Sequence, residues 1–103
     1  MVKVSVMYPN HEGTKFDMTY YINRHIPIVR QLLGSALRGV LSSKEFQARS
    51  PDRPPLTFAM GHLLFDSVEA FQTSFGPHAQ AIMEDIPNYT NSEPIVQISE
   101  VKL

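Results

Sequence analysis

The segment that most limits the possible folds is Thr57–Phe65, TFAMGHLLF, which contains no aspartate, glutamate, lysine or arginine and is apolar on both of its alternating faces. A strand of this kind belongs in the interior of a sheet that is covered from both sides. The chain has only 103 residues, so we expect a single domain, residues 1–103, with a modest core. What covers the two faces of this strand is therefore the first question about the fold.

Three further segments predict strands. Residues 2–8, VKVSVMY, alternate apolar with other side chains, which is the period of a half-buried strand. Residues 37–46 predict a weaker strand, because Gly39 and two serines interrupt it. Residues 94–103 predict a closing strand. Between the second and third strands, residues 47–55 contain three prolines and predict a surface loop that can cover the mouth of a pocket.

Two segments predict helices, and a proline interrupts each of them. The first begins at Asp17, which can accept from free N–H groups of the first turn while Phe16 packs on Tyr21. An apolar stripe of helical spacing follows and includes Ile22 and His25. Pro27 has no N–H to donate and crowds the preceding turn, at a cost of about 3 kcal/mol. We therefore expect a kink or break near His25, with two helical segments on either side.

The second helical segment begins after a cap at Asp66 or Ser67 and is divided at Pro77. Its last residues include Glu84 and Asp85, where negative charge is slightly unfavourable at the end of a helix. Two explanations fit this pair. It is either a solvated helix end or the place where a basic group of a dimer partner binds.

The order strand, helix, strand, strand, helix, strand predicts an α+β fold of ferredoxin-like type: a four-stranded antiparallel βαββαβ sheet with both helices on one face. This arrangement leaves the other face of the sheet bare. No segment remains to cover it, although the strand at residues 57–65 presents apolar groups on both sides. We therefore expect a homodimer in which two copies pack sheet against sheet.

Composition excludes several classes of function. The chain has no cysteine, which removes thiol nucleophiles and cysteine-based metal sites, and its four histidines show no HxH or HExxH spacing, so no metal site is predicted. A net charge of −1 provides no basic surface, so no nucleic-acid partner is expected. No stretch approaches the roughly 20 apolar residues of a membrane span, and the N-terminus lacks the apolar region of a signal peptide. We expect a cytoplasmic protein without a membrane partner.

His25 is the main candidate for chemistry, because an imidazole both takes and gives a proton near neutral pH. Tyr21 lies one turn earlier on the same face and is placed to hydrogen-bond the imidazole or a substrate oxygen, and the carbonyl of Asn23 can fix the tautomer. The alternative is a core histidine whose two ring nitrogens are satisfied by a carbonyl and a tyrosine. Both interpretations stay open.

Four other residues are candidates for binding a small hydrophobic molecule. His62 alternates with large apolar residues, and it would flank a pocket with His25 if its face of the sheet looked toward that residue. A hydrogen-bonded structural histidine is the alternative. Tyr8, Phe16 and Met60 are core residues by type, some of which can line an apolar pocket.

Two runs of the sequence, residues 16–27 and 60–101, resemble the EthD family, named for a protein of ethyl tert-butyl ether degradation clusters. The most specific parts are YYINRHIP, residues 20–27, and GHLLF, residues 61–65, which leads into the helix start DSVEAF. The resemblance implies a dimeric α+β barrel, in a superfamily that also holds muconolactone isomerases, cofactor-independent quinone-forming monooxygenases, polyketide cyclases and some haem enzymes. Residues 41–55 match the family least, and substrate choice is expected there.

Two functions follow from this sequence. The first is a small cofactor-independent enzyme that isomerises, cyclises, decarboxylates or oxygenates an aromatic or polyketide-like substrate in a degradation or secondary-metabolism pathway, with His25 as acid and base and Tyr21 as its hydrogen-bond partner. The second is a non-catalytic dimer that binds a hydrophobic ligand or assists an oxidising enzyme. Haem bound through a lone histidine is a lesser variant of the second.

Overall fold

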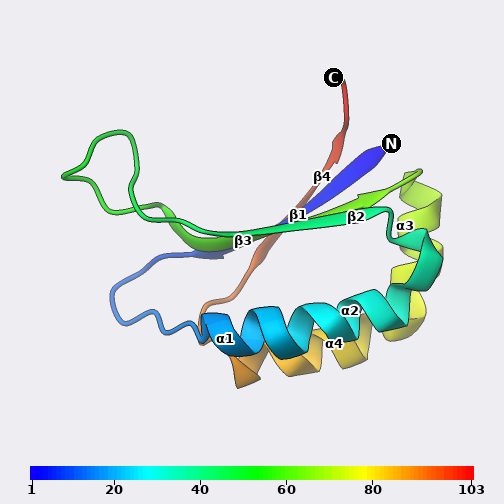
Figure 1. Ribbon diagram of the computed structural model, residues 1–103, viewed down its shortest axis with the longest axis horizontal. Coiled ribbons are helices and arrows are strands. Elements are labelled where there is room, and N and C mark those ends of the chain that lie inside the picture. Colours follow the sequence, from blue (N-terminus) through cyan, green and yellow to red (C-terminus); the bar gives the residue numbers. More distant parts are fainter.

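The fold has two layers, a four-stranded sheet and a layer of helices packed on one of its faces (Figure 1). The structure is a computed structural model that describes residues 1–103. Its strands are β1 (Val2–Pro9), β2 (Gly39–Lys44), β3 (Thr57–Phe65) and β4 (Ile95–Glu100). They lie in the order β2-β3-β1-β4, and every neighbouring pair is antiparallel. The predicted ferredoxin-like α+β fold is confirmed, with β3 in the interior of the sheet.

The first helical stretch consists of α1 (Met18–Tyr20), a π-helical turn (Tyr21–His25) and α2 (Ile26–Leu33). The predicted cap is confirmed, because the Asp17 carboxylate accepts from the backbone N–H of Tyr20 at 3.0 Å. α2 ends at Gly34, whose φ of 59° favours glycine.

The interruption expected near His25 takes the form of the π-helical turn, and the chain stays helical through it. The N–H of Ile26 donates to the carbonyl of Tyr21, five residues back. This wider turn changes the hydrogen-bond register just before Pro27, which has no N–H to donate. The extra residue also rotates the face of the helix. Ile22, which the spacing placed in the buried stripe, is therefore 43 % exposed.

The second helical stretch consists of α3 (Val68–Phe75), a 3₁₀ turn (Gly76–His78), α4 (Ala79–Asp85) and a further 3₁₀ turn (Ile86–Asn88). Of the two predicted caps, Ser67 is the one used, and its hydroxyl accepts from the N–H of Ala70 at 3.1 Å. None of the helices has the length and apolar character needed to cross a membrane.

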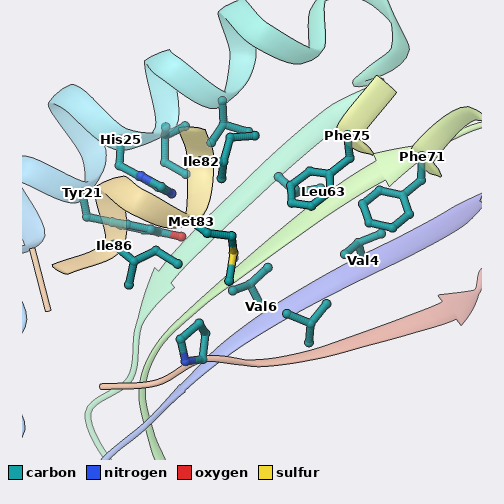
Figure 2. A pocket seen from close by; sticks show the side chains of 15 residues that line it. Val4, Val6, Tyr21, His25, Leu63, Phe71, Phe75, Ile82, Met83 and Ile86 are labelled. Atoms are coloured by element: carbon teal, nitrogen blue, oxygen red, sulfur yellow. The ribbon is translucent and has the colours of Figure 1, made fainter. Parts of the chain in front are cut away.

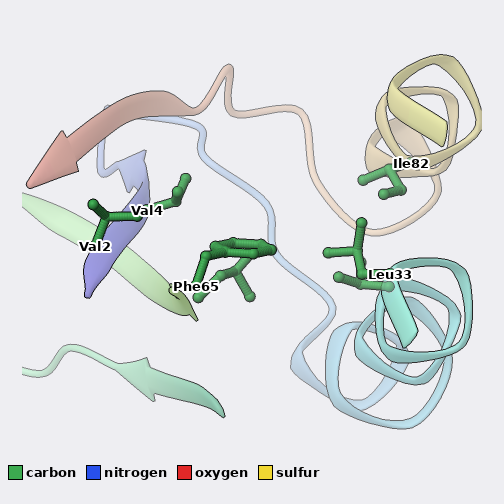
Figure 3. Close-up of a cluster of buried hydrophobic side chains, with 7 residues drawn as sticks. Val2, Val4, Leu33, Phe65 and Ile82 are labelled. Atoms are coloured by element: carbon green, nitrogen blue, oxygen red, sulfur yellow. The ribbon is translucent and has the colours of Figure 1, made fainter. Parts of the chain in front are cut away.

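Two clusters of buried side chains join the layers. The first lies between β1, β3, α2 and α4, where Phe65 and Val4 from the sheet face Leu33 and Ile82 from the helices (Figure 3). Removal of this apolar surface from water is the main stabilising term, about 25 cal/mol for each Å² buried. The second cluster is aromatic and lies where β1 leads toward α1. Its buried members are Tyr8, Tyr21, Ala59 and Tyr89.

The sheet face opposite the helices is covered by no element of this chain (Figure 1). Leu41 on β2, opposite His62 on β3, is 66 % exposed there, and Ile95 on β4 is 55 % exposed. The proline-containing loop, residues 45–56, extends from the far end of β2 and β3, away from the helix layer.

Candidate active site

A cavity of about 290 Å³ lies between the helices and the sheet (Figure 2). Twelve of its 15 lining residues are hydrophobic. The lining comes from β1, β3 and β4, from Pro94 just before β4, and from the π-helical turn, α2, α3, α4 and the 3₁₀ turn Ile86–Asn88. Met83 on α4 is 48 % exposed and Val96 on β4 is 52 % exposed, so the cavity is reached between these two elements. No residue of the 47–55 loop lines it.

His25 lies in the π-helical turn with 4 % of its surface exposed, and it points into the cavity (Figure 2). Its Nδ1 is 2.8 Å from Oδ2 of Asp85. A carboxylate only accepts hydrogen bonds, so Nδ1 carries the proton and donates. Nε2 makes no hydrogen bond to the protein. No fully buried side-chain nitrogen or oxygen lacks a partner, so Nε2 is accessible, and the space next to it is the cavity.

The carboxylate of Asp85 is held from three sides. Besides the imidazole of His25, the hydroxyl of Tyr20 donates to Oδ1 at 2.7 Å and the amide of Asn88 donates to the same oxygen at 3.0 Å. Partial burial alone would raise the pKa of Asp85, but the three hydrogen bonds outweigh it and hold that pKa below its usual range. Asp85 is therefore a fixed negative charge at neutral pH.

The charge state of His25 follows from its burial. Desolvation lowers the pKa of His25 below its usual value of 6.5, although the hydrogen bond and charge of Asp85 act in the opposite direction. At neutral pH the imidazole is therefore uncharged, with its proton on Nδ1 and a lone pair on Nε2. This is the protonation state of a general base.

Tyr21 lies beside His25 and points the same way into the cavity (Figure 2). The two rings are stacked, with centroids 5.8 Å apart and planes inclined by 18°. The Tyr21 hydroxyl lies 3.3 Å from the Oγ of Ser42 on β2. Burial raises the pKa of Tyr21, so its phenol keeps its proton.

Gly61 on β3 provides the space for this hydroxyl. A Cβ at position 61 would lie 2.5 Å from the Tyr21 oxygen, which is too close for an unshifted side chain. Sequence reasoning did not single out Gly61 or Ser42. The register of β2 and β3 decides which of their residues face Tyr21, and it pairs Ser42 with Gly61 so that both lie on that face of the sheet.

Tyr8 and Phe16 do not line the cavity. Both belong to the aromatic cluster, where the Tyr8 hydroxyl is 2.6 Å from that of Tyr89 and the Phe16 ring lies edge-on to Tyr21 at 5.2 Å. The packing of Phe16 on Tyr21 was predicted and is present. Tyr89 contacts the His25 ring with centroids 4.6 Å apart, so Tyr8 supports the site through one intermediate residue.

Met60 and His62 do not line it either. They alternate along β3 with Gly61, which faces the helices, so they lie on the uncovered face of the sheet. There the Nδ1 of His62 is 2.9 Å from the Oγ of Ser5. The condition for His62 to flank a pocket with His25 is therefore not met, because the sheet separates the two residues, and the hydrogen bond to Ser5 fits the alternative of a hydrogen-bonded structural histidine.

Sequence reasoning missed Asp85 as the partner of His25, although a signal was present. The unfavourable acidic pair Glu84–Asp85 at the end of a helix indicated that a basic group was needed nearby. That group is His25 of the same chain. The tautomer is thus fixed by a carboxylate, where the carbonyl of Asn23 was expected to fix it.

No group of three or more His, Cys, Asp or Glu side chains is placed to hold a metal ion.

Comparison with known proteins gives a consistent result. The model of the EthD domain matches residues 13–93. The structure is similar to an EthD-like protein of Ralstonia eutropha JMP134, with 41 % identity over 99 % of this chain and 92 % of that chain and a TM-score of 0.94.

Two more distant structures share the fold. An EthD family protein of Bacillus halodurans C-125 has 21 % identity, a TM-score of 0.76 and 99 % of each chain covered. A protein of Bordetella bronchiseptica with the provisional name antibiotic biosynthesis monooxygenase has 12 % identity and a TM-score of 0.61, with 99 % of this chain and 96 % of that chain covered. No curated protein matches the chain.

Proposed function

This chain belongs to the EthD domain family, and we propose that it is a small enzyme in which His25 removes a proton from an apolar substrate. One observation carries the proposal. Within the cavity, Nε2 of His25 has no protein partner, while Nδ1 is anchored on Asp85 at 2.8 Å. The large majority of buried polar side-chain atoms with a purely structural role are hydrogen-bonded, so a nitrogen left open to a cavity points to a ligand.

The catalytic steps are proton transfers. Nε2 accepts a proton from an acidic C–H or O–H of the substrate, and the imidazolium that forms is stabilised by the carboxylate of Asp85. The electron pair of the broken bond stays on the substrate. His25 then returns a proton to the same or a neighbouring atom. Return to the same atom gives exchange when the proton on Nε2 has first been replaced by one from solvent, and return to a neighbouring atom gives isomerisation.

The surroundings support this chemistry. The cavity walls are almost entirely apolar, so they exclude water from the base and strengthen its interaction with the fixed charge of Asp85. Hydrogen bonds from Tyr20 and Asn88 hold the Asp85 carboxylate in place, so little reorganisation accompanies proton transfer.

Deuterium exchange tests the proposal. β-Tetralone is an apolar bicyclic ketone with an acidic C–H, and its exchange in D₂O is followed by NMR. We expect the protein to accelerate the exchange, and the His25→Ala variant to return it to the buffer rate. His11→Ala, which replaces an exposed histidine, serves as the control and keeps the full rate. Equal acceleration by His25→Ala would contradict the proposal.

The apolar cavity also supports a second function, a protein that binds a hydrophobic molecule without changing it. Twelve hydrophobic lining residues provide binding energy whether or not His25 reacts. The same experiment separates the two functions. Binding of β-tetralone without accelerated exchange would favour the non-catalytic one.

We further propose that two copies pair through the uncovered faces of their sheets. The exposure of Leu41 and Ile95 supports this, because large apolar side chains on one open sheet face are typical of an interface.

A further inference from the structure

The polar atoms of the cavity are confined to one end. Only two of its lining side chains, those of His25 and Tyr21, carry a nitrogen or oxygen atom, and they lie side by side (Figure 2). A ligand that fills the cavity therefore has one polar group and an otherwise apolar body.

No cation lines the cavity. It contains no lysine or arginine, and the charged group nearest to His25 is the carboxylate of Asp85, 2.8 Å from the imidazole. A ligand carboxylate placed beside His25 would lose its water shell without gaining a positive partner, and it would be repelled by Asp85. The geometry thus disfavours anions at this end.

Tyr21 offers a hydrogen-bond donor beside the base. In its contact with Ser42 the serine hydroxyl can donate to the tyrosine oxygen, which leaves the phenolic hydrogen free to point into the cavity. Gly61 leaves open the space that this hydroxyl occupies. A donor adjacent to a base is the arrangement that binds a carbonyl oxygen while a neighbouring C–H is deprotonated.

We propose that the substrate is an uncharged, enolisable carbonyl compound with an apolar body, whose oxygen is bound by the hydroxyl of Tyr21 with Ser42 behind it. This inference rests on the proposed function and names its substrate class. Nε2 of His25 takes the proton from the carbon beside the carbonyl. The C–H electron pair becomes part of the enolate, whose negative charge lies on the oxygen that accepts from Tyr21, and the proton returns from His25 to carbon. No electrons enter or leave.

Three probes of equal shape test the ligand class by titration calorimetry. Benzylacetone carries a ketone, hydrocinnamate carries a carboxylate in its place, and isopentylbenzene has no polar group. We expect benzylacetone to bind about ten-fold more tightly than hydrocinnamate, because only the latter must lose a charged hydration shell. Equal or tighter binding of hydrocinnamate would overturn the inference.

Tyr21→Phe tests the donor, since it keeps the ring and its stacking. We expect about a five-fold loss of benzylacetone affinity, in keeping with one neutral hydrogen bond, and no change for isopentylbenzene. Ser42→Ala should weaken the binding of benzylacetone and leave that of isopentylbenzene unchanged. The matched control is Ser43→Ala, on the other face of β2, which should leave both affinities unchanged. Equal losses for both probes would indicate a packing role and overturn the inference.

The two proposals fail separately. Accelerated exchange of β-tetralone that depends on His25 but is unchanged in Tyr21→Phe would overturn the substrate class and leave the general base in place. Selective, Tyr21-dependent binding of benzylacetone without accelerated β-tetralone exchange would overturn the catalytic proposal and uphold the ligand class.

Discussion

His25 and Asp85 form a hydrogen bond of 2.8 Å although 60 positions separate them in the chain. The imidazole comes from the π-helical turn of the first helical stretch and the carboxylate from the last residue of α4. Each side chain stabilises the other. The carboxylate gains a donor at a helix end that disfavours it, and the imidazole gains a fixed orientation. The bond therefore joins the two helical stretches at the place where the cavity is polar.

Asp85→Asn should slow proton transfer without opening the cavity. The variant removes the charge that stabilises the imidazolium, so we expect the rate of β-tetralone exchange to fall by roughly 100-fold. It should also lower the pKa of His25 further, because Asp85 acts to raise that pKa. NMR titration of the His25 ring measures this shift, and a pKa that rises in the variant would contradict the assignment.

Tyr20→Phe tests whether the tyrosine positions Asp85. Its hydroxyl is one of the donors that hold the pKa of Asp85 low, so the variant should raise that pKa. Carboxyl NMR titration reports the shift directly, and the exchange rate should fall several-fold at unchanged benzylacetone affinity. An Asp85 pKa that does not move would assign Tyr20 a packing role only.

Stability should fall as the pH drops from neutral through 6.5. The pKa of His25 is lower in the folded protein than its unfolded value of 6.5, so the unfolded state binds more protons between these two values. The free energy of unfolding therefore rises with pH in this window, and the contribution of His25 to it disappears on acidification. His62 has a pKa shift of the same sign, so His25→Gln should reduce the slope of Tm against pH without removing it. An unchanged slope would contradict the lowered pKa of His25.

Gly61→Ala should displace the Tyr21 hydroxyl. The new Cβ would lie 2.5 Å from that oxygen, and overpacking of this kind costs about 1–3 kcal/mol. Denaturant unfolding measures the cost. In a Tyr21→Phe background the clash partner is gone, so the same substitution should cost less. Equal costs in both backgrounds would show that the crowding lies elsewhere.

Leu41→Glu should prevent pairing of the proposed dimer and leave the subunit folded. Leu41 is 66 % exposed in a single chain, so a charge there is tolerated until a second sheet covers it. Light scattering after gel filtration gives the mass of wild type and variant. Val68→Glu, on the helix layer and 40 % exposed, should stay dimeric as the matched control. A monomeric wild type would contradict the pairing.

The fold could be predicted because its signals are local. Alternation in residues 2–8, the cap at Asp17 and the uncharged run at residues 57–65 each fix one element, and the order of the elements leaves few topologies. The inward direction of His25 followed from helical spacing. The outward rotation of Ile22 did not, because the π-helical turn depends on how Pro27 is accommodated.

The rest of the site depends on contacts between distant segments. Asp85 reaches His25 only because α4 and the π-helical turn lie side by side, and no spacing within one helix encodes that. Ser42 and Gly61 join Tyr21 through the register of β2 and β3. The side of the sheet on which His62 lies stayed open for the same reason: alternation predicts which residues share a face, but not which face the helices cover.

The pH dependence of β-tetralone exchange, measured beside the NMR titration of the His25 ring in the same samples, tests the central claim most directly. The account predicts that the protein-dependent rate is constant at and above neutral pH and falls on acidification with a midpoint below 6.5 that coincides with the pKa of His25. A rate with another midpoint, or one that persists in His25→Ala, would contradict the assignment of His25 as the base.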